Sequence, residues 1–110
     1  MDIREGLKAD LLAARKGGDA EAVDQLRILL AAIGNAEAVE LDASQPREVH
    51  GSAEVPRRRL TADDLAGIIR REAQELRSAA DDYERRGKPD EAERLRARAR
   101  LVDRYLADQG

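Results

Sequence analysis

Apolar side chains recur at helical spacing along most of the chain, in segments separated by glycines and prolines. In the first segment, Ile3, Leu7, Leu11 and Ala14 lie three or four positions apart, which predicts an amphipathic helix over residues 3–16. A pair of glycines follows directly. Glycine just past a helical segment is a common stop signal, because it adopts the left-handed conformation that ends a helix at little cost.

A second apolar stripe begins after these glycines and predicts a helix over residues 20–40. Asp19 stands immediately before it and is a favourable N-cap. The stripe carries Val23, Leu26, Leu30, Ile33 and Glu37, and is widened by Leu29 and Ala36. Because the connection to the first helix is so short, the two helices are expected to form an antiparallel hairpin.

The helical period is lost over residues 41–60, LDASQPREVHGSAEVPRRRL, which predicts a long irregular loop. Pro46 and Pro56 prevent one continuous helix through this segment. Irregular segments of this length are unusual inside a small domain, so this loop is expected to be either mobile or functional.

The remaining residues predict a second hairpin. Thr61 opens a helix over residues 62–86, with acidic residues in its first turn that favour the positive end of the helix dipole. Gly87 suits the position just past this helix, and Pro89 suits the first position of the next, which is predicted over residues 89–107.

The predicted fold is therefore all-α, with two antiparallel helical hairpins joined by one long irregular loop and no competing strand pattern. The side chains predicted to face the core are Leu26, Leu30, Ile33, Leu65, Ile69, Leu76, Leu95 and Val102. The exposed face of the third helix is predicted to carry the i,i+4 ion pairs Asp81–Arg85, Asp82–Arg86 and Glu84–Lys88.

Composition supports a single small domain and limits its core. At 110 residues the chain is expected to form one domain, and it contains no Phe or Trp, so its core depends on Leu, Ile, Val and Ala. Such a core leaves a thin margin against chain entropy, and a homodimer or another protein partner would add to it. The charged amino terminus lacks a signal-peptide pattern, and no apolar run is long enough to span a bilayer, so a cytoplasmic location without membrane contact is expected.

Few residues point to catalysis. The chain has no Cys, and its one histidine, His50, stands in the predicted loop without a second histidine nearby. No nucleotide-binding or nucleophile motif occurs. We therefore expect no catalytic residue, no metal and no cofactor. Glu72 falls on the edge of an apolar stripe, where a structural pair with an arginine is the favoured interpretation.

Basic residues are concentrated around the start of the third helix, although the net charge is −3. Arginine binds phosphate through two parallel hydrogen bonds, which makes such a cluster a candidate RNA contact. The candidates are Arg57, Arg58, Arg59, Arg70, Arg71 and Arg77. No aromatic residue is interleaved to stack a base, so a solvated loop that balances the acidic first half is the competing interpretation, and DNA binding is not expected.

The sequence resembles the GatB/YqeY-like family over almost its whole length. LRILLAAIGNAEA (Leu26–Ala38) resembles the family's second-helix signature, RREAQELRSAADDYERRGKPDEAE (Arg70–Glu93) its next segment, and LVDRYLADQG its terminal YLP pattern. The polar motif residues that this resemblance singles out are Arg27, Asn35, Glu37 and Glu72. Ala107 stands where the family usually has proline, and the family's second small helical domain, which normally follows this point, is expected to be absent.

The resemblance implies a relation to the carboxy-terminal part of the B subunit of tRNA-dependent amidotransferases, a family labelled as carbon–nitrogen ligases with glutamine as amido-N-donor. We accordingly expect an accessory helical domain, associated with tRNA or with amidotransferase subunits and not catalytic by itself. The alternative is a helical protein–protein interaction module unrelated to tRNA.

Overall fold

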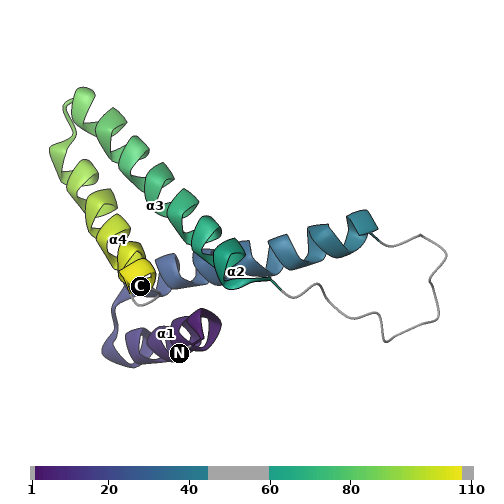
Figure 1. The fold of residues 1–110 in the computed structure, drawn as a ribbon. Helices are drawn as coiled ribbons and strands as arrows, with labels where there is room; N and C mark the ends of the chain where they lie inside the picture. The colour runs from purple at the N-terminus through teal and green to yellow at the C-terminus, as the bar shows by residue number, and fades with distance from the viewer. Residues whose placement is uncertain (1, 45–59, 108–110) are drawn as a thin grey trace.

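The computed structural model describes residues 2–44 and 60–107 of the chain and is helical, without strands, over these ranges (Figure 1). The helices are α1 (Ile3–Gly17), α2 (Ala20–Ser44), α3 (Ala62–Arg85) and α4 (Pro89–Ala107). They form two antiparallel hairpins, α1–α2 and α3–α4, which confirms the predicted all-α fold. The connection over residues 45–59, with most of the predicted loop, lies outside the described residues.

The turn between α1 and α2 is made by the glycine and aspartate that the sequence indicated. Gly18 has a φ of 72°, and its N–H donates to the carbonyl oxygens of Ala14 and Arg15. Asp19 Oδ1 accepts a hydrogen bond from the N–H of Ala22 at 3.1 Å, so this carboxylate caps the start of α2. A left-handed glycine followed at once by a capping aspartate reverses the chain within two residues.

The helices of the second hairpin also begin and end at residues with specific capping interactions. Thr61 and Asp64 form a capping box at the start of α3: Thr61 Oγ1 accepts from the Asp64 N–H at 3.0 Å, and Asp64 Oδ2 accepts from the Thr61 N–H at 2.9 Å. Gly87, with a φ of 76°, ends α3, and Pro89 is the first residue of α4.

One predicted boundary differs clearly from the structure. α2 was expected to end near Glu40, but it continues to Ser44, so residues 41–44 of the predicted loop are helical. The apolar stripe fades at that point, yet no helix-breaking residue occurs before Pro46. A proline disfavours the helical conformation of the residue that precedes it, so α2 can extend until Ser44 and no signal stops it earlier.

The two hairpins meet along the first half of α2. α3 and α4 run side by side as a long arm, α2 lies between α1 and the foot of this arm, and the C-terminal part of α2 extends past α3 (Figure 1). A single apolar cluster spans both hairpins. Its buried members are Ile3, Leu7, Leu26, Leu29, Ile33, Leu60, Leu65, Ile69, Ala73, Leu76, Ala99, Val102 and Tyr105.

Most of the predicted core is confirmed. Six of the predicted side chains are buried, namely Leu26, Ile33, Leu65, Ile69, Leu76 and Val102. Leu30 and Leu95 are only half-buried and pack against the edge of the cluster. Leu29, predicted merely to widen the stripe, has no exposed surface, because α2 packs on α1 with one side and on the α3–α4 hairpin with another. A helix between two partners buries a broader stripe than a helix with one.

Candidate functional site

The arginines predicted to contact RNA do not all share the same environment. Arg57, Arg58 and Arg59 lie outside the described residues. Arg70 and Arg71 are exposed on α3, and neither forms an ion pair with a described residue. Arg77 instead donates to Asp103 of α4 at 2.9 Å, so its guanidinium group links the two helices of the arm.

The polar residues of the family-like motifs are held by different neighbours. Arg27 and Asn35 are exposed on α2. Glu37, half-buried, forms an ion pair with Arg4 of α1 and helps to close the first hairpin. Glu72, also half-buried, faces α2 from α3. Between described residues, no hydrogen bond or ion pair joins any two of these four side chains, so they do not form one site.

Glu72 has a partner that the sequence did not indicate. Gln25 of α2 is completely buried, and its Nε2 donates to Glu72 Oε2 at 3.0 Å. The arginine pair expected for Glu72 is therefore wrong for the described residues: the neighbour is an amide. A sign of this pair was present in the sequence, since Gln25 lies on the buried stripe between Ala22 and Leu29.

Arginines of α4 hold the start of α2 by ion pairs. Arg98 contacts Glu21 at 2.6 Å and Asp24 at 3.1 Å, and Arg94 contacts Glu21 at 2.6 Å. The hydrogen bonds from Arg94 and then Arg98 lower the pKa of the Glu21 carboxyl below its ordinary value. Glu21, Asp24 and Arg94 are exposed while Arg98 is half-buried, and ion pairs with such exposed partners contribute little to the free energy of unfolding.

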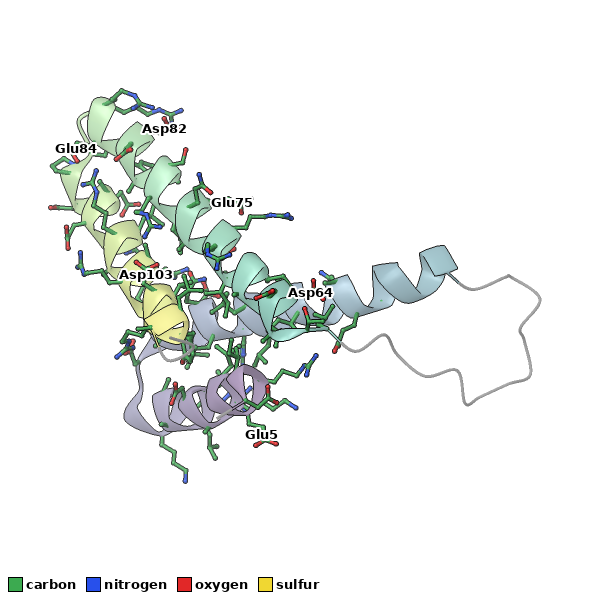
Figure 2. All side chains as sticks on the ribbon, viewed as in Figure 1. Glu5, Asp64, Glu75, Asp82, Glu84 and Asp103 are labelled. Carbon is green, nitrogen blue, oxygen red and sulfur yellow. The ribbon has the colours of Figure 1, made fainter. Side chains whose placement is uncertain are left out.

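Within the α3–α4 arm, contacts between helices replace some of the predicted contacts along one helix. Arg96 of α4 pairs with Asp81 at 2.9 Å and with Glu84 at 2.6 Å, while Arg85 pairs with Asp82. Figure 2 shows Asp82 and Glu84 near the turn of the arm and Asp103 towards its foot. The three predicted i,i+4 pairs are therefore wrong for the described residues, namely Asp81–Arg85, Asp82–Arg86 and Glu84–Lys88. Because α4 packs against α3, Arg96 lies close to Asp81 and Glu84. The spacing of residues along α3 alone gives no information about such a neighbour.

A groove runs between α4 and the α1–α2 hairpin. It consists of three hollows of about 150, 260 and 480 Å³, in order from the arm towards the foot of α4. Neighbouring hollows share lining residues, Arg94 and Arg98 in the first pair and Ala22 and Leu101 in the second. At the end of the groove, the Tyr105 hydroxyl donates to Asp10 of α1. The lining of the groove combines apolar side chains, such as Ala22 and Leu101, with charged ones, such as Arg94 and Arg98.

The groove offers little for chemistry at a reacting centre. In the part of the chain that the structure describes, no group of three or more His, Asp or Glu side chains is placed to hold a metal ion. Several of the charged groups that line the groove are engaged with one another, as Glu21 is with Arg94 and Arg98. What the arrangement can do is present charge and a shaped surface to another molecule.

Comparison with known proteins identifies no relative: no protein family, no curated protein and no solved structure matches this chain. The resemblance to the GatB/YqeY-like family therefore stays a prediction from the quoted motifs. Over residues 2–44 and 60–107, none of the helices is both long and apolar enough to cross a membrane.

Proposed function

We propose that this chain is a non-catalytic helical accessory domain that binds tRNA, or an amidotransferase complex carrying tRNA, through the arginines at the start of the α3–α4 arm. One observation carries the proposal. Arg70 and Arg71 are adjacent, exposed and without an ion pair among the described residues, whereas Arg77, Arg96 and Arg98 each hold a carboxylate of another helix. Guanidinium groups left in this state are available for phosphate oxygens.

The basic sequence before α3 is attached close to these two arginines. Leu60 is buried and Thr61 caps α3, so the chain enters this helix at a fixed point, directly after Arg59. At a rise of about 1.5 Å per residue, Arg70 lies roughly 14 Å along the helix from Thr61. That separation allows one RNA strand to contact both groups of arginines.

Affinity is expected to be weak. Asp63 and Asp64 occupy the first turn of α3, between the two groups of arginines, and the chain carries a net charge of −3. Both features repel RNA and offset part of the attraction. If three arginines contact phosphate, the logarithm of the binding constant should fall with the logarithm of salt concentration with a slope of about −2.

Fluorescence anisotropy with labelled tRNA and the full chain tests this proposal. Arg70→Ala combined with Arg71→Ala should weaken binding and make the salt slope less steep by about 1.4, since each lost single-strand contact is worth about 0.7. Arg85→Ala combined with Arg86→Ala is the matched control, because it removes the same charge from the other end of α3 and should leave the slope nearly unchanged. Equal weakening by both double variants would mean that net charge acts, not this site.

The rest of the candidate site is tested in the same assay. Replacing Arg57, Arg58 and Arg59 by alanine should flatten the slope further while helical content, measured by circular dichroism, stays the same. If the full chain does not bind tRNA even at low salt, the tRNA proposal is wrong. Stable co-purification with an untagged protein that requires no RNA would then favour the protein-interaction alternative.

The non-catalytic part of the proposal has a separate test. The sequence lacks a cysteine nucleophile and a nucleotide-binding loop, so the chain alone should not release ammonia from glutamine. Glutamine-dependent ammonia release at enzyme-like rates, abolished by a single substitution, would contradict it. Light scattering over a range of protein concentrations tests whether the chain also forms the homodimer that its thin core favours.

A further inference from the structure

The interface between the two hairpins differs from the interior of either one, and we call this interface the hairpin seam. The hydrogen bonds and ion pairs that cross it connect polar side chains of α1 and α2 with polar side chains of α3 and α4. They are Gln25 with Glu72, Glu21 with Arg94 and Arg98, Asp24 with Arg98, and Asp10 with Tyr105. Ion pairs also cross inside each hairpin, as between Arg4 and Glu37 and between Arg77 and Asp103, but among the described residues only the seam buries a polar side chain completely, that of Gln25.

Gln25 is the unusual residue of the hairpin seam. Its side chain is fully buried, its Nε2 donates to Glu72, and its Oε1 has no hydrogen-bond partner among the described residues. Turning the amide over does not help, because the NH₂ group must face the Glu72 carboxylate. A buried carbonyl oxygen without a donor costs free energy that is recovered when the oxygen meets water. Gln25 therefore opposes closure of the seam.

Packing at the hairpin seam is also incomplete. Two hollows, of about 260 and 480 Å³, lie along it and are lined by Ala22 and Leu101 from the two sides, and a third of about 150 Å³ is lined by Glu21 and Leu95. Side chains that border a hollow lose dispersion contacts that close packing would supply. Leu29 and Ile33 are buried in the cluster that spans both hairpins, so apolar burial favours the closed arrangement. The unsatisfied amide and the hollows reduce the free-energy difference between the closed and the open arrangement.

We propose that the α1–α2 hairpin opens and closes on the α3–α4 arm as a unit, and that the buried amide of Gln25 keeps the closed arrangement from being permanent. Each hairpin is held by its own short turn and its own helix–helix packing, so the seam can part without unfolding either. This inference goes beyond the proposed function, because it concerns a motion of the chain alone and does not depend on tRNA.

Distances between spin labels measure this motion directly. The chain contains no Cys, so labels attach only where cysteine is introduced. Leu12→Cys on α1 with Ser78→Cys on α3 places one label on each hairpin at exposed positions. Ser78→Cys with Arg100→Cys on α4 places both labels on the arm. The first pair should give two distance populations in frozen solution, and the second pair should give one narrow population.

Substitution of Gln25 then tests the cause. Gln25→Leu should reduce the open population of the first label pair about tenfold, since it removes an unsatisfied buried acceptor, while Glu72, which is only half-buried, can meet water once its amide partner is gone. Gln74→Leu is the matched control, because Gln74 is exposed on α3, and it should leave both populations unchanged. Gln25→Met, which is closer to glutamine in shape, should act like Gln25→Leu and serves if leucine does not fit.

Three results would overturn the inference. One is a single narrow distance for the first label pair in the otherwise natural chain. The second is an open population that Gln25→Leu and Gln25→Met both leave unchanged, as expected if ordered water satisfies Gln25 Oε1. The third is loss of helical circular dichroism in both Gln25 variants, which would make the amide a requirement of the fold instead of a limit on closure.

Discussion

The two hairpins of this protein are closed by side chains of different size. Between α1 and α2 the buried positions are filled by large aliphatic groups, with Leu7, Leu26 and Leu29 showing 0–2% exposure. Along the α3–α4 arm many of the buried positions are alanines: Ala73, Ala80, Ala92 and Ala99 are equally buried, beside the larger Ile69, Leu76 and Val102. Large side chains bury much area at few positions, whereas alanines bury little area each but let two helices approach closely over a long distance. The first hairpin should therefore be sensitive to lost volume, and the arm to added volume.

The largest effect is expected from removing volume in the first hairpin. Leu7→Ala should lower the free energy of unfolding by about 2–5 kcal/mol, because Leu7 is fully buried and its neighbours cannot collapse fully onto the space that is left. Urea unfolding followed by circular dichroism measures the change. Leu12→Ala is the matched control on the same helix: Leu12 is 53% exposed, and its loss should cost less than about 0.5 kcal/mol. Similar losses for both would remove the basis of the comparison.

The next effect is expected from adding volume to the arm. Ala99→Leu should cost about 1–3 kcal/mol, because Ala99 is 2% exposed within the core cluster and a larger group there forces its neighbours apart. Ala97→Leu, at an exposed position of the same helix, should change the same denaturation midpoint little. If Ala99→Leu stabilises the protein, the arm is loosely packed and closure by small residues is the wrong description.

The turns should respond alike, because each relies on one left-handed glycine. Gly18→Ala and Gly87→Ala should each cost about 1 kcal/mol, since φ is 72° and 76° at these positions. Gly34→Ala in α2 and Gly67→Ala in α3 are the controls: nothing lies near the added methyl group, and each should stabilise its helix by about 0.5–1 kcal/mol. Thermal unfolding of the four variants separates turn strain from helix propensity, and a loss at Gly34 or Gly67 would show that the methyl group meets an obstacle.

The smallest effect concerns acid stability at the hairpin seam. Arg94 and Arg98 lower the pKa of Glu21 from 4.5, so the folded chain holds this carboxylate charged more strongly than the unfolded chain does. The resulting stabilisation is present above pH 4.5 and is lost as the pH falls through the lowered folded-state pKa. Glu21→Gln should remove this small contribution, so that the variant loses less stability on acidification. Urea unfolding between pH 3 and pH 7 measures it, with Glu5→Gln as an exposed control on α1. An identical pH dependence in both variants would mean that the arginine contacts at Glu21 do not persist in solution.

The sequence did not predict which side chains of the candidate site would pair with residues of another helix. The concentration of basic residues singled out Arg70, Arg71 and Arg77 together, but Asp103 of the facing helix forms an ion pair only with Arg77. The same limit explains the Arg96 contacts with Asp81 and Glu84, because residues on two helices become neighbours only when the helices pack. Periodicity describes one helix at a time, and a site shared by several helices requires their relative placement.

Sequence alone determined the helices, most of their ends and their pairing into hairpins, but not the end of α2. Apolar spacing, the glycines at 18 and 87, the Thr61 cap and Pro89 are local signals, and the short connections leave antiparallel packing as the available arrangement. Tertiary structure alone decided how one hairpin lies on the other. In this packing Leu95 is only half-buried, Leu29 and Gln25 are completely buried, and Glu72 accepts a hydrogen bond from the Gln25 amide. Local signals act over a few residues of one chain segment, whereas the burial and partners of these side chains depend on segments far away in the sequence.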